Sequence, residues 1–311
     1  MFLRVTNGVA EEVDPDAARI NSFDSSFLEI RMFSIGDGEC VLVVSPERDA
    51  WLIDAGRGTR PAKNIALAGQ IVQYLDDENL TLRAAIASHP HSDHSMAYTT
   101  LLTTPHPRVD RPLPFIRSDD PAWFKKPSVW LPLIRGAIAT GAVETVIENR
   151  NIDLALGPLI KAMVFSDGKA SNTAYTSLFV HLRFRDATIL FTGDAYKEYE
   201  KRMLAEFGAG FFESDVLKVT HHGSKGGTDK DVLEKIDPGF AFASTGGKDD
   251  DKHGMSTKAR TTLVDQGVMI FETFQDENKN RDGRDIVIQT DGNPFDGTGV
   301  LYKVERVPAK F

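Results

Sequence analysis

The sequence has a single cysteine, no long apolar run and no excess of positive charge. The one cysteine, Cys40, excludes an intrachain disulfide, and its apolar neighbours predict a packed side chain. No segment approaches the roughly 18 consecutive apolar residues that a membrane-spanning helix needs. The N-terminus also lacks the apolar core of a signal peptide. We therefore expect a cytoplasmic protein without membrane contact, and not a membrane channel.

The charge balance is acidic, with 36 Lys and Arg residues against 45 Asp and Glu residues and a formal net charge of −9. A protein that coats nucleic acid normally carries a basic face, which this balance does not suggest. A phosphodiester or nucleic-acid substrate stays open, since bound divalent metal ions would supply positive charge where it is needed. Nothing in the sequence indicates an oligomeric state.

Short apolar segments predict strands and helices along most of the chain. Strands are expected at 27–35, 40–44, 51–54, 82–87, 162–165, 177–184, 188–191, 216–219, 240–244, 269–274, 285–288 and 300–304, and helices at 61–75, 131–142, 196–207, 229–236 and 256–266. Their alternation favours one α/β (α+β) domain over residues 1–311, with helices packed outside a sheet-on-sheet core.

Two segments lack this pattern. Residues 1–25 are polar, and Glu11, Glu12 and Asp14 predict a solvated lead-in. Residues 98–160 hold several prolines in their first half, which argue against regular structure. We interpret about 98–160 as an insertion or a lid over the functional site.

Four potential metal ligands stand close together in His89-Pro90-His91-Ser92-Asp93-His94, directly after an expected strand. In a loop at the end of a strand such side chains converge, whereas along a helix or strand they point in different directions. Imidazole and carboxylate are ligands that Zn²⁺ prefers, with Mn²⁺ or Fe²⁺ as alternatives where more oxygen ligands are present. The segment therefore predicts a metal-binding loop.

Further metal-type side chains stand where other apolar strands end. Asp54, Asp194 and the pair His221-His222 each follow such a strand, and His253 lies in a later loop. Functional sites are usually built on loops at one end of a rigid sheet, because the sheet fixes their geometry. We expect these side chains to gather around the histidine cluster.

With these motifs the chain resembles the metallo-β-lactamase superfamily, whose His-x-His-x-Asp-His signature is present as His89, His91, Asp93 and His94. Within it the chain is most similar to the ComEC type, the hydrolase domain of bacterial DNA-uptake channels, which also occurs free-standing. The segments that carry this likeness are Phe33-Ser34-Ile35-Gly36-Asp37-Gly38, Leu52-Ile53-Asp54-Ala55-Gly56, Leu190-Phe191-Thr192-Gly193-Asp194 and Leu217-Lys218-Val219-Thr220-His221-His222-Gly223-Ser224. The resemblance implies a four-layer αββα sandwich.

The resemblance also implies two divalent metal ions, with Zn²⁺ preferred over Mn²⁺ or Fe²⁺. It assigns His89 and His91 to the first ion and Asp93 and His94 to the second, with Asp194 bridging the two. His222 would complete the coordination of the second ion, since it overlays the ligand histidine of the family's Val-Pro-Gly-His-Gly better than His221 does. Asp54 would accept a hydrogen bond from a ligand imidazole and fix its tautomer.

Three departures from the family pattern concern this site. Many relatives have a third histidine for the first ion, and the corresponding window here holds Ser171-Asn172, so that Asn172 is the nearest polar candidate. Relatives often have Gly-Gly after the signature, where this chain has Ser95-Met96-Ala97. Their C-terminal Gly-His-Pro is replaced by His253-Gly254-Met255, which leaves open whether His253 contacts metal or substrate.

The implied chemistry is hydrolysis by a metal-activated water. Asp93 or Asp194 would orient the water, and His221 or His253 would stabilise charge or donate a proton to the leaving group. Ser224 and Lys225, in a glycine-rich segment, are candidates for binding an anionic oxygen of the substrate.

Three functions remain open from the sequence. The ComEC resemblance favours a phosphodiesterase or nuclease. The acidic charge balance mildly favours a small-molecule hydrolase that acts on a lactone, thioester or β-lactam. A non-catalytic metal-binding module is the third, if the incomplete first metal site has lost its function.

Overall fold

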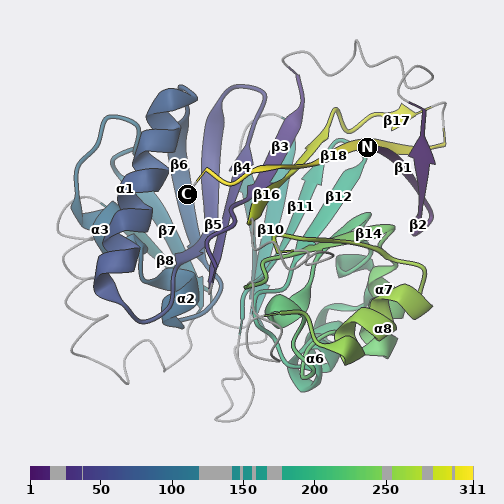
Figure 1. Cartoon of the computed structure of the whole chain (residues 1–311). Helices are drawn as coiled ribbons and strands as arrows, with labels where there is room; N and C mark the ends of the chain where they lie inside the picture. Colours follow the sequence, from purple (N-terminus) through teal and green to yellow (C-terminus); the bar gives the residue numbers. More distant parts are fainter. Residues whose placement is uncertain are drawn as a thin grey trace.

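The structure is a computed structural model of the chain with two β-sheets packed face to face and helices on both outer faces (Figure 1). The description covers residues 1–14, 26–36, 38–118, 142–147, 150–155, 159–166, 177–246, 254–274, 283–295 and 298–310.

The first sheet has 11 strands in this part of the chain. Strands β5 to β8 run parallel to one another, and the other pairings, including β4 with β5, are antiparallel. In sheet order they are β2 (Val9–Val13), β1 (Phe2–Thr6), β18 (Gly299–Pro308), β16 (Arg284–Thr290), β3 (Leu28–Met32), β4 (Glu39–Val44), β5 (Asp49–Gly56), β6 (Thr81–Ala87), β7 (Leu113–Ser118) and β8 (Ala142–Ile147), with β17 (Pro294–Phe295) beside β18.

The second sheet has seven described strands, of which β12 to β15 are parallel and the rest antiparallel. Its order is β15 (Met269–Glu272), β14 (Phe240–Ala243), β13 (Val216–Lys218), β12 (Ala187–Phe191), β11 (Phe179–Phe184), β10 (Ile160–Ser166) and β9 (Arg150–Ala155).

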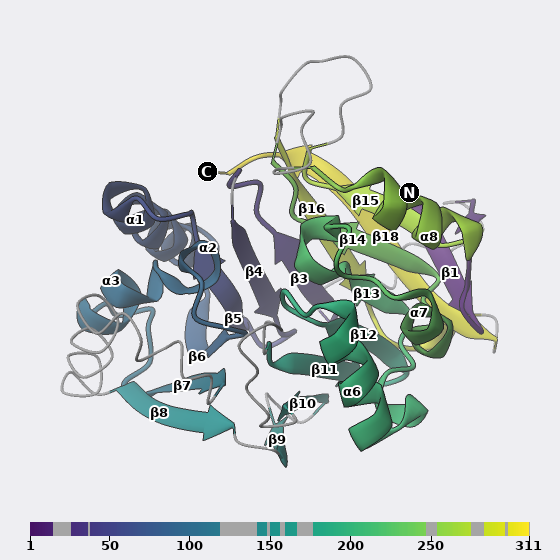
Figure 2. The ribbon, with the colours of Figure 1, turned by 90° about the horizontal axis from the view of Figure 1, so that it is seen from below.

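Helices cover the outer faces of both sheets (Figures 1 and 2). On the first sheet lie α1 (Pro61–Asp77), α2 (Ser92–Ser95) and α3 (Tyr98–Thr103); on the second lie α6 (Lys197–Phe207), α7 (Lys230–Ile236) and α8 (Thr257–Asp265), with single turns η2 (Ala209–Phe211) and η3 (Thr220–Gly223).

Three separate apolar layers hold these elements together. Trp51 and Phe242 belong to the layer between the two sheets. Leu67 of α1 belongs to the layer between that helix and the first sheet, and Met203 of α6 to the layer between that helix and the second sheet. Each sheet therefore buries both of its faces, one on the other sheet and one on helices. This is the predicted four-layer αββα sandwich.

The N-terminal residues belong to the first sheet, although their polar composition predicted a solvated lead-in. β1 pairs with β18, and its Leu3 and Val5 are buried between the sheets. β2 forms the edge, where Glu11 and Glu12 are exposed. Charged side chains on an edge strand disfavour pairing with another chain. The prediction is wrong for residues 2–13, and 15–25 lie outside the described residues.

The segment 98–160 supplies α3 and three strands where it is described, rather than an insertion. β7 and β8 extend the first sheet and β9 extends the second. Pro114 is tolerated because it lies at the start of β7, before the pairing with β6 begins at Phe115. The prediction is therefore wrong for these elements. Residues 119–141, with nearly all of the helix expected at 131–142, lie outside the described residues.

The parallel strands β6 of the first sheet and β12 and β13 of the second are each followed by a segment that carries predicted site residues, and β5 carries Asp54 near its end. Figure 2, seen from below, shows the ends of both sheets facing each other there. None of the described helices is long and apolar enough to span a bilayer.

Candidate metal centre

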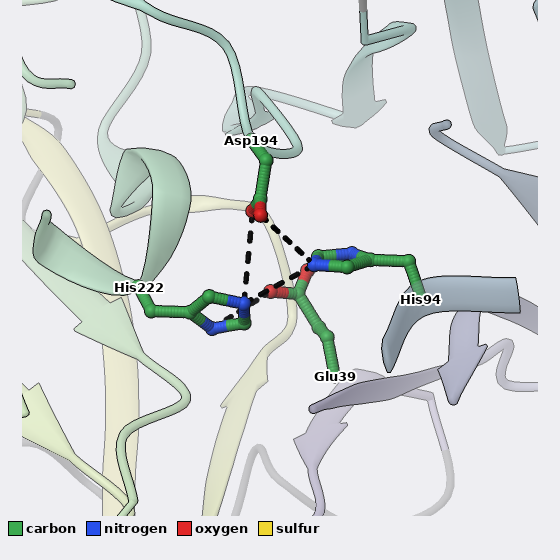
Figure 3. Close-up of side chains that lie close together, drawn as sticks. All are labelled: Glu39, His94, Asp194 and His222. Atoms are coloured by element: carbon green, nitrogen blue, oxygen red, sulfur yellow. Dashed lines mark hydrogen bonds and ion pairs between the residues drawn. The ribbon is translucent and has the colours of Figure 1, made fainter. Parts of the chain in front are cut away.

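Side chains from both sheets converge between these loops. Ligand atoms of Glu39, His94, Asp194 and His222 all lie within 4.8 Å of one another, and so do those of His89, His91 and Asp194. Figure 3 shows the first group pointing toward a common point. Asp194 belongs to both groups, so its carboxylate lies where two ligand sets meet.

The histidine segment combines a loop with one helical turn, rather than the loop that the sequence predicted throughout. β6 ends at Ala87, residues 88–91 are irregular, and α2 begins at Ser92. The rings of His89 and His94 are 4.3 Å apart and those of His89 and His91 are 4.6 Å apart. The turn of α2 thus carries Asp93 and His94 back toward the histidines of the loop.

Asp54 is aimed at this centre by a bulge in β5. Cys40 pairs with Ala55 and Val41 with Ile53, which leaves Asp54 without a partner, and its φ is 57°. Such bulges redirect a side chain out of the regular pleat. The buried carboxylate of Asp54 lies 2.8 Å from Nδ1 of His94 and accepts from the backbone N–H and hydroxyl of Ser88, each at 2.7 Å. It therefore fixes the orientation of the His94 ring.

Two imidazole nitrogens face each other in the centre. Nδ1 of His94 is hydrogen-bonded to Asp54, and Nδ1 of His222 to the carbonyl oxygen of Ser244 at 3.0 Å. Both Nε2 atoms consequently carry a lone pair in the neutral rings, yet they are only 3.1 Å apart. Two lone pairs at this distance repel each other unless a cation lies between or beside them.

The charges around Asp194 also favour a cation. Burial opposes ionisation, but the imidazoles of His94 and His222 outweigh it and hold the pKa of Asp194 well below its usual range. Although burial lowers the pKa of His94, the carboxylates of Asp194 and Asp54 raise it well above the usual value. The Oδ1 atom of Asp194 is buried and accepts no hydrogen bond from any described residue. This donor set fits a divalent metal ion.

His221 and His222 are directed into the centre by a strained turn. After β13 their backbone φ angles are 50° and 52°, in the left-handed region that costs about 1–2 kcal/mol per non-glycine residue. The turn places Nε2 of His221 3.6 Å from Oδ2 of Asp194, and Nε2 of His222 3.7 Å from Oδ1. Burial lowers the pKa of both imidazoles. Each therefore stays neutral at pH 7, the form in which a ring nitrogen binds metal.

The sequence-based predictions did not include Glu39 and Lys218, which form a buried ion pair beneath the centre. Their charged atoms are 2.5 Å apart and both side chains are almost fully buried. Nζ of Lys218 donates to the carbonyl oxygen of Gly193 at 3.1 Å and lies 4.0 Å from Oδ1 of Asp194. Despite burial, which lowers it, the carboxylates of Glu39 and Asp194 raise the pKa of Lys218. We infer that Glu39 neutralises the charge of Lys218 rather than binding a metal ion.

A signal for this pair was present in the sequence. Glu39 directly precedes the apolar run of β4, and Lys218 stands inside an apolar strand. Glutamate and lysine are almost never fully buried unless they are paired. Two opposite charges in buried strands could have indicated a partnership.

Some of the remaining predicted site residues line a cavity beside the centre, and others do not. A cavity of about 530 Å³ opens beside the centre, and Asp93, His221, His222 and Ser224 line it. Lys225 is exposed and is not among the lining residues. Asn172 and His253 lie outside the described residues.

Gly56, at the end of β5, lets the ligand-bearing turn pack against the strand. A Cβ there would lie 2.4 Å from the carbonyl oxygen of Ser92 and 2.6 Å from the backbone nitrogen of His94. Gly56→Ala should therefore displace the turn and weaken metal binding at least about tenfold, measured by titration against a chelating indicator.

The matched control for this change is Gly69→Ala in α1, where a Cβ would meet nothing within 4 Å. It should leave metal affinity unchanged and raise stability by about 0.5–1 kcal/mol. Wild-type affinity in the Gly56→Ala protein would contradict the packing role of this glycine.

An αββα sandwich with imidazoles and carboxylates gathered at one end of its sheets defines a metallo-β-lactamase fold with a candidate metal centre, as the sequence motifs predicted. The sequence profile of the metallo-β-lactamase superfamily matches residues 35–247, and the chain belongs to this superfamily.

Curated relatives confirm the resemblance to the ComEC type. The chain is similar to ComE operon protein 3 of Bacillus subtilis, with 28% identity over 267 residues, and to Recombination protein 2 of Haemophilus influenzae, with 25% identity over 223 residues. The alignments cover 81% and 70% of this chain but 32% and 24% of those proteins. The chain thus spans about a third and a quarter of the length of these relatives.

Solved structures are similar at low identity. The metallo-β-lactamase fold protein YhfI from Bacillus subtilis is 14% identical with a TM-score of 0.49, over 78% of this chain and 95% of that one. The short form of human tRNase Z is 13% identical with a TM-score of 0.41, over 78% and 93%.

Proposed function

We propose that this chain is a metal-dependent phosphodiesterase that holds two divalent ions, with Zn²⁺ preferred and Mn²⁺ or Fe²⁺ as alternatives. The observation that carries the proposal is Asp194, whose carboxylate belongs to both groups of ligand atoms. When bound, such a pair of ions lowers the pKa of a water molecule and stabilises charge on the attacking and leaving oxygens at phosphorus. The name of one relative, Recombination protein 2, is in line with a nucleic-acid substrate.

The ligand assignment follows the two groups. We assign His89 and His91 to one ion and His94 and His222 to the other, with Asp194 shared. Asp93 joins the second set, because its Oδ2 lies 3.9 Å from Nε2 of His94 and 4.0 Å from Nε2 of His222.

The cavity side of the centre carries the residues proposed to handle the substrate. Asp93 is partly exposed there, and we assign it the role of orienting the attacking water. His221 also lines the cavity, and its neutral ring offers one N–H to an oxygen on which negative charge develops. Asp54 and Ser244 act through His94 and His222 by fixing the two ring orientations.

The test is a substrate panel on protein loaded with Zn²⁺ or Mn²⁺. We expect hydrolysis of bis(p-nitrophenyl) phosphate and no turnover of nitrocefin, a lactone or a thioester. Turnover of one of those three without phosphodiester cleavage would make the chain a small-molecule hydrolase instead. No turnover of any ester, with metal bound, would leave a metal-binding module.

A further inference from the structure

A wall of positive charge lies beside the candidate metal centre. Arg57, Arg60 and Lys63 line the same cavity of about 530 Å³ as Asp93 and His222. Arg57 follows the end of β5, Arg60 precedes α1, and Lys63 is in the first turn of that helix. These three residues are called the cationic wall below.

No described carboxylate neutralises the wall. Within the described part of the chain, no carboxylate lies within 4.0 Å of a charged nitrogen of these three residues. Among the described lining residues the only acidic side chain is that of Asp93, which belongs to the centre. In a chain with a net charge of −9, three described cations therefore gather at this cavity.

The loop that carries the wall is held rigidly. Asn64 is 1% exposed, and its Oδ1 accepts the backbone N–H of Arg57 at 2.7 Å. Its Nδ2 donates to the carbonyl oxygens of Gly58 at 2.9 Å and Arg60 at 3.0 Å. One buried amide thus fixes the loop from 57 to 60, so the cavity edge needs little ordering on binding.

The basic residues of the wall do not stabilise α1, because they lie at its N-terminus. The start of α1 is the positive end of its dipole, where acidic side chains are stabilising and basic ones are not. The first turn of α1 nevertheless has no acidic residue and contains Lys63. Basic side chains at this positive end of the helix dipole suit a bound anion.

We propose that the cationic wall binds a phosphate that neighbours the scissile phosphodiester, so that the substrate is a chain of phosphodiesters such as an oligonucleotide. This inference rests on the proposed function and names its substrate class. Ions held by the histidines and Asp194 would neutralise the scissile phosphate, so three further cations are available for a second one. Arginine forks bind phosphate through paired N–H groups, which fixes the register of the strand.

The experiment compares substrates with and without a second phosphate. For Arg57→Ala/Arg60→Ala/Lys63→Ala, kcat/KM on a short oligothymidylate should fall on the order of 10- to 100-fold. Cleavage of bis(p-nitrophenyl) phosphate should stay within about twofold, because that ester has no second phosphate. The salt dependence of oligothymidylate cleavage should become shallower, by about 0.7 in log–log slope for one lost phosphate contact. The dinucleotides TpT and pTpTp test whether a flanking phosphate is sufficient without a longer strand. Cleavage of TpT, which has only the scissile phosphate, should not depend on the wall, whereas cleavage of pTpTp should.

A matched control removes three exposed lysines on α7 and α8, Lys230→Ala/Lys235→Ala/Lys258→Ala, and should change neither substrate. Binding of a fluorescent oligothymidylate to chelator-treated protein, followed by anisotropy, tests the wall without turnover. Equal losses on both substrates, or wild-type behaviour of the wall variant, would overturn the inference. Failure of the wild-type protein to cleave any phosphodiester, with wall-dependent binding intact, would instead refute the proposed function.

Discussion

Asp194→Asn should lower kcat/KM for phosphodiester hydrolysis by on the order of 1000-fold or more. Asparagine keeps the shape of the side chain but removes the charge that the neighbouring imidazoles of His94 and His222 stabilise. Because this carboxylate belongs to both ligand groups, the variant should also hold fewer metal ions per chain than the wild-type protein. Steady-state kinetics and elemental analysis after gel filtration measure the two effects.

The matched control for Asp194→Asn is Asp186→Asn, in the exposed turn between β11 and β12. It removes the same charge and should change neither metal content nor rate. An Asp194→Asn protein with wild-type metal content and activity would refute a shared carboxylate at the centre.

Lys218→Met should lower the free energy of unfolding by about 3–5 kcal/mol. Glu39 would then be a buried carboxylate without its counter-ion, and Gly193 would lose the donor to its carbonyl oxygen. Urea denaturation of chelator-treated protein, followed by circular dichroism, measures this loss. Adding Glu39→Gln to Lys218→Met should recover part of it, because no unpaired charge then remains in the interior.

A control on α6 tests whether the loss of stability depends on the burial of the ion pair or only on the loss of a lysine charge. Lys201→Met removes an exposed lysine that pairs with Asp229 and with the exposed Asp231, so it should cost far less stability than Lys218→Met. Equal losses for Lys201→Met and Lys218→Met would mean that the buried pair contributes no more than a surface pair.

The sequence predicted which residues gather at the candidate centre because most of them stand directly after an apolar strand. His89, Asp194 and His222 follow β6, β12 and β13, and Asp54 lies within β5 near its end; the apolar residues of these strands identify them as buried. Strand ends in a layered fold lie at a common edge, so the pattern alone brings distant residues together. The alternation of strands and helices indicated helices outside a sheet-on-sheet core, and the resemblance to the metallo-β-lactamase superfamily implied the four-layer αββα sandwich.

The structural features that the sequence did not predict depend on pairing between elements that are distant in the chain. Glu39 and Lys218 meet because the two sheets face each other; their place in apolar strands indicates that each needs a partner, but no local pattern identifies the other residue as that partner. Lys225 was expected to contact an anion on the basis of neighbouring glycines, whereas the lining cations come from residues 57–63. β1 joins the first sheet through β18 at the other end of the chain, a partner that composition cannot show.

The 3.1 Å approach of Nε2 in His94 to Nε2 in His222 means that a proton and the proposed metal ion would compete for one place. A proton held by His94 satisfies the facing nitrogens when no ion is bound, and it has to leave before a cation takes both. Metal loading should therefore release protons into the buffer. Acidification should empty this half of the centre by displacement, long before it unfolds the sandwich around it.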